Sequence, residues 1–246
     1  MCFNKINKLK LELDSLRPLP AASLRNLDEI YRVEWTYHSN AIEGNTLTLF
    51  ETKVVLEEGL TIGGKTLREH FEVINHGEAI QYVKDLVDRK IELSENVVKS
   101  IHQLVLRNID DENAGRYRTI NVGISGSKHN PPNFIAVPDK MEQLIQWYQQ
   151  KKDHLHPVEL AAKLHFQFVY IHPFTDGNGR TARLLMNLVL MSYGFPPAIV
   201  KAESGVRLQY YETLEEASVK DNLNPFIHLI AGCVEESLEK YISVVK

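Results

Sequence analysis

Apolar residues recur at helical spacing along most of this 246-residue chain, and that pattern limits the possible folds more than any other feature. In residues 23–40, for example, Leu24, Leu27, Ile30 and Tyr31 lie on one face of a predicted helix. The same spacing predicts further helices over residues 66–89, 95–107, 139–151, 157–170, 179–193, 207–220 and 225–241. A short helix is also expected at the N-terminus.

Capping residues mark the start of two of these segments. Thr48 is followed three residues later by Glu51, and Thr66 is followed in the same way by Glu69, which is the spacing of a capping box. The first box opens a predicted helix that stops near Gly59, because glycine is the usual residue just past a helix end.

Residues 113–138 interrupt the helical pattern with several glycines and prolines. Within this stretch, residues 119–124 and 133–137 are predicted to form two short strands of a β-hairpin flap. The expected fold class is therefore all-α, mainly helical, with one short β-hairpin flap. We expect two parts, an N-terminal helical segment of residues 1–60 and a larger domain of residues 61–246.

The composition is that of an ordinary globular protein, with 43% hydrophobic residues, 24% charged residues and a net charge of −4. This balance argues against a nucleic-acid-binding protein, which usually carries an excess of basic residues. No apolar run reaches the roughly 20 residues of a membrane-spanning helix, and residues 1–20 lack the apolar centre of a signal peptide. Because Cys2 and Cys233 are the only cysteines, neither a disulfide framework nor a cysteine metal site is expected, and we predict a cytoplasmic protein.

Residues 172–183, with the sequence HPFTDGNGRTAR, combine groups that few structural needs require together. A histidine transfers protons, a carboxylate holds divalent cations, and two arginines neutralise negative charge. Gly177 and Gly179 let backbone N–H groups face an anion at the start of the next predicted helix, where the helix dipole also favours negative charge. Each residue alone has an ordinary explanation, such as a turn or a solvated basic face, but the combination favours chemistry on a polyphosphate.

This run resembles the signature of the Fic family, HPFx[D/E]GNGRxxR, at every defined position. Residues 115–118 and 184–187 also resemble the segments that flank the signature in Fic domains, and the resemblance covers at least residues 95–241. It implies a Fic-type helical bundle with residues 61–246 as the catalytic domain. It also implies transfer of AMP from ATP to Ser, Thr or Tyr hydroxyls of target proteins.

The resemblance implies a role for each polar residue of the signature. His172 would be the general base that takes the proton of the attacking hydroxyl, and Asp176 would hold Mg²⁺ on the phosphates. The other members would bind the phosphates of ATP, and they are Gly177, Asn178, Gly179, Arg180 and Arg183.

Three residues of a later predicted helix bear on the nucleoside. Tyr210 and Tyr211 match a tyrosine pair of the adenosine pocket in the family, although Tyr210 is equally well explained as a core aromatic. Ser218 stands where a related pattern has an asparagine that contacts the nucleotide, which leaves the base contact open but not the phosphate chemistry. The protein target would lie along the flap, near residues 119–137, as an extended segment paired with its edge.

Residues 39–44, SNAIEG, match the inhibitory motif [S/T]xxxE[G/N] of regulated Fic proteins. The resemblance implies that Glu43 forms a salt bridge with Arg183 and keeps it from the γ-phosphate, with Ser39 and Gly44 as the other motif residues. This arrangement indicates the class with an N-terminal inhibitory helix, and thus an autoinhibited adenylyltransferase that also modifies itself.

Two other functions stay open at this point. In some similar enzymes the same glutamate positions a water that removes AMP from modified protein, so Glu43 and His172 would serve a deAMPylase. The chain would otherwise be a nucleotide-sensing interaction module, although the intact His172 argues against a module without catalysis. Many relatives self-associate, so a homo-oligomer is open as well. The sequence names neither the target nor the trigger.

Overall fold

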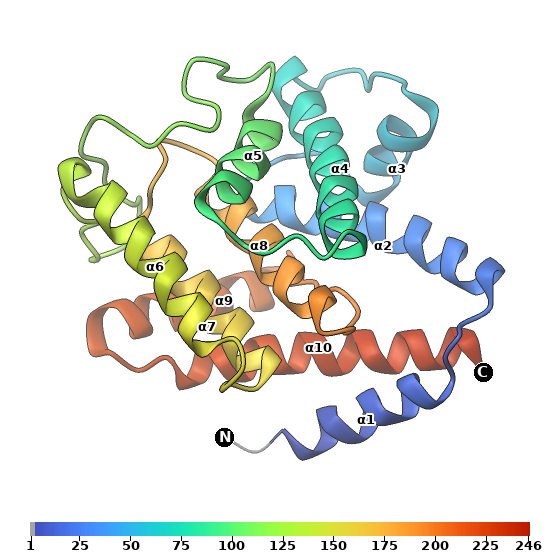
Figure 1. Ribbon diagram of the computed structural model, residues 1–246. Helices are drawn as coiled ribbons and strands as arrows, with labels where there is room; N and C mark the ends of the chain where they lie inside the picture. The colour runs from blue at the N-terminus through green and yellow to red at the C-terminus, as the bar shows by residue number, and fades with distance from the viewer. Residues whose placement is uncertain (1–2) are drawn as a thin grey trace.

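A computed structural model describes residues 3–246 of the chain, and these residues form an assembly of α-helices (Figure 1). The helices are α1 (Asn4–Ser15), α2 (Ala21–Ile42), α3 (Leu49–Glu58), α4 (Leu67–Asp88), α5 (Glu95–Leu106), α6 (Val137–Lys151), α7 (Pro157–Ile171), α8 (Asn178–Ser192), α9 (Ser204–Lys220) and α10 (Asn224–Val245). Every helix expected from apolar spacing is present, with ends that differ by a few residues. The all-α fold class is confirmed.

The two predicted capping boxes are confirmed. The Thr48 side chain accepts the N–H of Glu51 and the Glu51 side chain accepts the N–H of Thr48, and Thr66 and Glu69 make the same exchange at the start of α4. Helix α3 ends where expected, because Gly59 has φ 66°, a left-handed conformation that costs glycine little.

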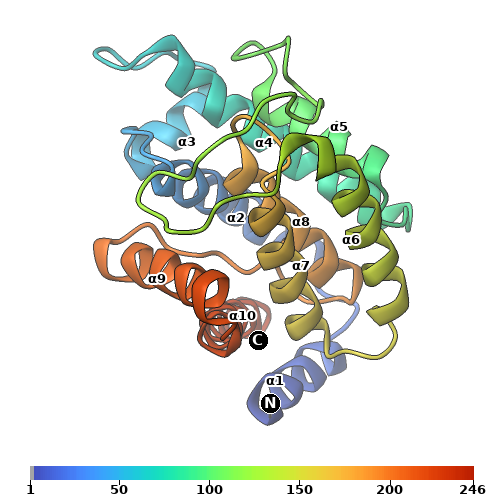
Figure 2. The same ribbon diagram turned by 90° about the vertical axis from the view of Figure 1, so that its left-hand side faces the viewer.

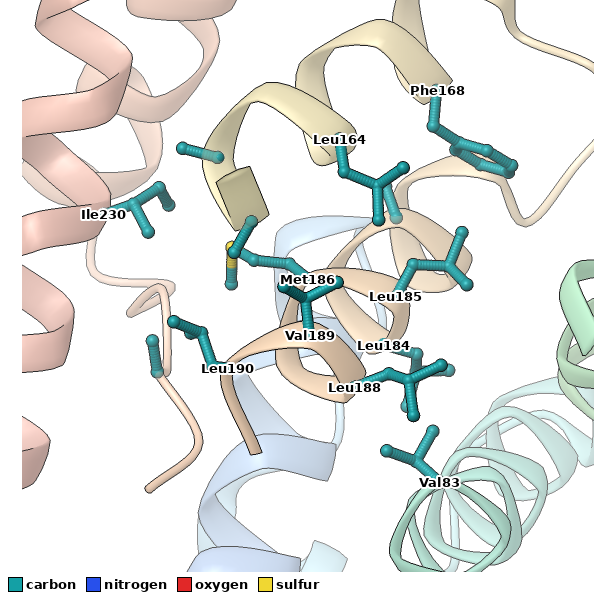
Figure 3. Packing of buried hydrophobic residues seen from close by; sticks show 14 of the residues in the cluster. Val83, Leu164, Phe168, Leu184, Leu185, Met186, Leu188, Val189, Leu190 and Ile230 are labelled. Atoms are coloured by element: carbon teal, nitrogen blue, oxygen red, sulfur yellow. The ribbon is translucent and has the colours of Figure 1, made fainter. Parts of the chain in front are cut away.

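Helix α8 runs through the middle of the molecule, and Figure 1 shows it with other helices on several sides. Its residues from Asn178 to Leu190 are almost all buried, and it packs against α2, α4, α5 and α7. In the close view of Figure 3, Leu185 points toward Leu164 and Phe168 of α7, and Leu188 points toward Val83 of α4. Each such buried side chain contributes roughly 1.5–3 kcal/mol, so the core holds the start of α8 rigidly.

One continuous hydrophobic core contains side chains from both expected parts of the chain, residues 1–60 and residues 61–246. It includes Ile6 of α1, Leu27 and Ile42 of α2, Val83 of α4 and Ile230 of α10. Helix α1 lies beside α10, and α2 packs on α4 and α8 (Figure 1). The N-terminal helices are therefore part of the body that carries α8, which brings the residues near position 43 close to the loop before α8.

The predicted β-hairpin flap is wrong. No strand occurs among residues 3–246, and residues 107–133 form an irregular loop with turns. Residues 134–136 form a single turn of 3-10 helix, η1 (Phe134–Ala136), and Val137 already begins α6. Pro131 and Pro132 lack the backbone N–H that a strand ladder needs.

Side chains, in place of a strand ladder, join the two limbs of this loop. Arg118 donates to the carbonyl oxygens of Ile120, at 2.9 Å, and of Pro132 on the other limb. Asn121 Oδ1 accepts the backbone N–H of Phe134 at 3.0 Å. Figure 2 shows this loop extending from the α5–α6 side of the molecule toward α9.

In the described part of the chain, no helix combines the length and apolar character that a membrane crossing requires. Cys233 lies on α10, and burial raises the pKa of its thiol to about 12, so it is a poor nucleophile. Cys2 lies outside the described residues.

Candidate active site

The signature forms a sharp loop between α7 and α8. His172 ends α7 in the left-handed conformation, with φ 50° and ψ 60°, and Gly177 adopts φ 73° just before α8 begins at Asn178. The Asn178 side chain closes the loop, because its Oδ1 accepts the N–H of Phe174 at 3.0 Å and its Nδ2 donates to the Phe174 carbonyl at 2.9 Å. With 3% of its surface exposed, Asn178 shapes the loop with its side chain.

His102 of α5 supports this loop, and sequence reasoning missed it. Its Nδ1 accepts the N–H of Gly115 at 2.9 Å, so the neutral ring carries its proton on Nε2, which lies 2.9 Å from the carbonyl oxygen of Asp176. The ring stacks on Phe174 with centroids 3.5 Å apart. Burial lowers the pKa of His102 to about 4, and Arg180 adds to the effect. A lone histidine at helical spacing carries no signal that would have marked it.

His172 presents a neutral imidazole to a pocket that Glu43 and Tyr211 also line. Its Nδ1 lies 3.3 Å from the Val169 carbonyl oxygen, which favours the tautomer with the proton on Nδ1 and leaves Nε2 as an acceptor. Burial lowers the pKa of His172 and Arg118 adds to that effect, against the opposing influence of the Val169 carbonyl and of Glu43. The ring is therefore in the form that accepts a proton near pH 7.

Asp176 lies at the mouth of the loop among cations. Its Oδ1 accepts the N–H of Gly177 and a bond from Arg180 Nη2 at 3.2 Å, and its Oδ2 accepts Arg68 Nη2. Burial alone would raise the pKa of Asp176, but Arg180, the Gly177 N–H and Arg68 outweigh it and keep the carboxylate ionised. Glu72 of α4 lies 3.4 Å from Arg180 Nη1, an ion pair by distance that is poorly aligned as a hydrogen bond.

Among residues 3–246, no group of three or more metal-ligating side chains is present. Asp176 is a partly exposed carboxylate beside the start of α8, and the carboxylate of Glu72 shares Arg68 and Arg180 with it. This donor set fits Mg²⁺, which is commonly held by one or two carboxylates together with the phosphates of its nucleotide and with water.

Arg183 is almost fully buried, and each of its nitrogens is used. Nη2 donates to Glu43 Oε1 at 2.7 Å and to the Ser39 carbonyl oxygen at 2.8 Å. Nε donates to Ser39 Oγ at 3.0 Å, and Nη1 donates to the Tyr210 hydroxyl at 3.2 Å. The Tyr210 hydroxyl also lies 3.0 Å from His165 Nε2. The structure thus brings Ser39, Glu43 and Arg183 together from positions about 140 residues apart.

The end of α2 carries the glutamate to this arginine. The helix ends at Ile42, Glu43 is its C-cap, and Gly44 reverses the chain with φ 100°. The Tyr211 hydroxyl donates to the Ile42 carbonyl at 3.0 Å, which ties α9 to the helix end. Of the tyrosine pair, Tyr210 is buried and Tyr211 is partly exposed at the pocket.

The pocket beside His172 has a volume of about 590 Å³. Glu43 and Gly179 line one part of it, and Tyr211, Glu215 and Ser218 of α9 line another. The Ser218 hydroxyl donates to the Leu214 carbonyl of its own helix at 2.8 Å. Glu215 accepts the Ser127 hydroxyl and the N–H of Lys128, so the loop between α5 and α6 is fastened across the pocket to α9 (Figure 2).

The structure thus brings a histidine in its basic form, an ionised carboxylate and two buried arginines together at the start of a central helix in an all-α protein. A family model described as the Fic/DOC family matches residues 92–190, which include this loop. The solved structure of a Fic domain containing signaling protein from Bacteroides thetaiotaomicron is 30% identical, with a TM-score of 0.91 and coverage of 98% of this chain and 97% of that one. The chain belongs to the Fic/DOC family.

Other relatives agree with this assignment. A fragment of Fic-1 from Caenorhabditis elegans is 36% identical, with a TM-score of 0.86, and the match covers 97% of this chain and 71% of that structure. A protein adenylyltransferase Fic from Nematostella vectensis is 41% identical over 97% of this chain, and a protein adenylyltransferase fic-1 from C. elegans is 39% identical over 99%. The chain spans 56% and 47% of these two curated relatives, or about half of their length.

Proposed function

We propose that this chain is an autoinhibited protein adenylyltransferase, which transfers AMP from ATP to Ser, Thr or Tyr hydroxyls of target proteins and of itself. The observation that carries the proposal is the loop at the start of α8. His172, in its basic form, and Gly179 line the pocket there, Arg183 pairs with the pocket residue Glu43, and Asp176 pairs with Arg180 at the same helix start. The relatives named protein adenylyltransferase Fic support the reaction class.

In the proposed reaction, the target hydroxyl oxygen attacks the α-phosphorus of ATP while its proton passes to Nε2 of His172. An oxygen–phosphorus bond to the target forms, the bond from the α-phosphorus to the bridging oxygen breaks, and pyrophosphate leaves with the electron pair. The N–H of Gly179 and the positive end of α8 would bind phosphate oxygens, whereas the N–H of Gly177 donates to Asp176 Oδ1. Arg180 and, once it is free, Arg183 neutralise the leaving pyrophosphate.

Asp176 would hold a Mg²⁺ ion against the phosphates, where the ion would neutralise part of the charge on the leaving group. The protein target would lie along residues 119–137, because this loop borders the pocket and is fastened to α9 through Ser127. The adenosine would lie in the part of the pocket that Tyr211 and Ser218 line.

Inhibition follows from the contacts of Arg183. Its guanidinium is shared between Glu43, Ser39 and Tyr210, which occupy four of its five N–H groups and compete with the γ-phosphate for them. The Glu43 carboxylate also adds negative charge beside Gly179, where phosphate charge would lie. ATP would bind in this state only in an unproductive position.

A deAMPylase is the second candidate. Glu43 is 35% exposed at its side chain and lines the same pocket as His172, so it has access to a water molecule there. In that direction Glu43 would orient the water, and a protonated His172 would return a proton to the leaving hydroxyl.

Incubation with ATP and Mg²⁺, followed by mass spectrometry, tests the proposal. The wild-type chain is expected to show little self-modification, Glu43→Gly a strong mass increase of one AMP, and Glu43→Gly with His172→Ala none. Glu58→Gly, which removes a carboxylate at the end of α3, is the matched control and should resemble the wild type. Glu43→Gly without AMP transfer to itself or to a mixture of candidate proteins would contradict the proposal. Release of AMP from modified protein by the wild type, lost in Glu43→Gly, would favour the deAMPylase.

A further inference from the structure

Arg68 occupies the one oxygen of Asp176 that the loop itself leaves free. Oδ1 already accepts Arg180 and the Gly177 N–H, whereas Oδ2 is bonded to Arg68 Nη2. Arg68 comes from the first turn of α4, 108 residues away in the chain, and plays no part in the reaction described above. A metal cation that coordinates Asp176 through Oδ2 must therefore compete with Arg68 for this oxygen.

The pair is easily separated. The side chains of Arg68 and Asp176 are 56% and 42% exposed, and ion pairs in such surroundings contribute little to stability and are screened by salt. A guanidinium and a divalent cation cannot both bind one carboxylate oxygen, since their charges repel at that distance. The Arg68–Asp176 ion pair thus occupies Oδ2 in the metal-free protein, and it is weak enough for a divalent cation to displace it.

Arg68 has a second carboxylate to hold it after displacement. Its Nε lies 3.2 Å from Glu72 Oε1, one turn further along α4, and the same oxygen lies 3.4 Å from Arg180 Nη1. The other oxygen, Glu72 Oε2, accepts Asn45 Nδ2 at 2.9 Å, just after the inhibitory motif. Because Glu72 is anchored by Asn45, it keeps Arg68 at the edge of the site.

We propose that Arg68 takes the place of a metal ion, because its guanidinium neutralises Asp176 in the metal-free protein. When a divalent cation binds with the nucleotide, Arg68 loses its contact with Asp176 and keeps its ion pair with Glu72. Arg68 is a positioning residue in this role, since it sets the position and charge of Asp176 without touching the reacting atoms. The inference rests on the proposed function, because it takes a nucleotide triphosphate with its divalent cation as the ligand.

The test compares nucleotide binding with and without metal. The Kd of an ATP analogue with an imido bridge between its α- and β-phosphorus atoms, which cannot release AMP, is measured by titration calorimetry in Glu43→Gly protein, once with saturating Mg²⁺ and once with EDTA. The ratio of the Kd in EDTA to the Kd in Mg²⁺ reports how much the metal assists binding. In Arg68→Gln this ratio should rise by about two- to fivefold, the range expected for loss of an exposed competing ion pair.

Two controls separate this role from a general loss of charge. Arg68→Lys retains a cation that reaches for Asp176, so its ratio should stay closer to that of the parent. Arg107→Gln removes another exposed arginine, which is paired with Glu78 and not with Asp176, and should leave the ratio unchanged. An unchanged ratio in Arg68→Gln, or an equal rise in Arg107→Gln, would overturn the inference while the proposed function stands. Failure of the analogue to bind the Glu43→Gly protein under either condition would overturn both.

Discussion

The carboxylate of Glu43 lies against Gly179, so close that a Cβ at position 179 would collide with Oε1. Gly179, which lacks a side chain, thus leaves room for the Glu43 carboxylate. Its φ is not positive, so the requirement for glycine comes from the neighbouring carboxylate and not from the backbone conformation.

Gly179→Ala should therefore destabilise the wild type more than it destabilises Glu43→Gly. Overpacking of this kind costs about 1–3 kcal/mol, and most of that cost is expected to disappear when the carboxylate is removed. Thermal unfolding of the four proteins of this double-mutant cycle gives the coupling between the two positions. Equal losses in both backgrounds would show that Glu43 does not occupy this space in solution.

Ser39→Ala should partly release the inhibition. Arg183 Nε would lose the hydroxyl acceptor at 3.0 Å, while the bonds to the Ser39 carbonyl and to Glu43 remain. A hydrogen bond to a charged group contributes about 1.5–3 kcal/mol, so self-modification should rise to a level between the wild type and Glu43→Gly. The rate of label transfer from ATP, measured for the wild type, Ser39→Ala and Glu43→Gly, tests this ranking. Ser15→Ala, at the exposed end of α1, is the matched control.

Acid should begin to weaken the fold as the pH falls below 6.5, because buried histidines resist protonation. An unfolded histidine protonates near pH 6.5, whereas His102 in the folded protein does so near pH 4, because burial disfavours its charged form. Between these values the unfolded chain binds more protons, so the free energy of unfolding falls as the pH drops from 6.5 to 4, by about 3 kcal/mol from this residue. His76 and His165, also buried with lowered pKa, act in the same direction.

Denaturant unfolding of the wild type and of His102→Phe across this pH range measures that contribution. The phenylalanine keeps the stack on Phe174 but cannot titrate, so the variant should be less stable at pH 7 and its stability should vary less with pH. His154→Phe, at an exposed position after α6, should keep the wild-type slope. Parallel pH curves for His102→Phe and the wild type would contradict the assignment.

The activity of Glu43→Gly should persist to lower pH than an ordinary histidine base would allow. Burial lowers the pKa of His172, and the Glu43 charge opposes that shift, so removal of Glu43 lowers the pKa further. The imidazole is neutral above its pKa, and kcat/KM should therefore be lost only as the pH falls below 6.5, the ordinary value. A pH profile of AMP transfer locates this acid limb. Loss of kcat/KM already above pH 6.5 would exclude a His172 with a lowered pKa as the general base.

The helices and the catalytic loop were predictable because their signals act over a few residues. Capping boxes at Thr48 and Thr66, the glycine at the end of α3 and the apolar spacing of α8 each depend on contacts within about four positions. The β-hairpin was predicted wrongly because extended, proline-containing segments look alike whether or not a partner strand is within reach. In this fold Arg118 supplies the cross-link between the limbs that strand pairing would have made.

The local sequence thus determined the helices and pointed to the side chains of the proposed reaction, His172 and Asp176 among them, since each lies in a short run of characteristic chemistry. The partners of those side chains were decided only by tertiary packing. Arg68, His102 and Glu72 approach the loop from α4 and α5, and no local pattern marks them. Long-range charge pairing depends on where packed helices bring side chains, and the buried position of Arg183 beside Glu43 exists only because α2 and α8 pack in one core.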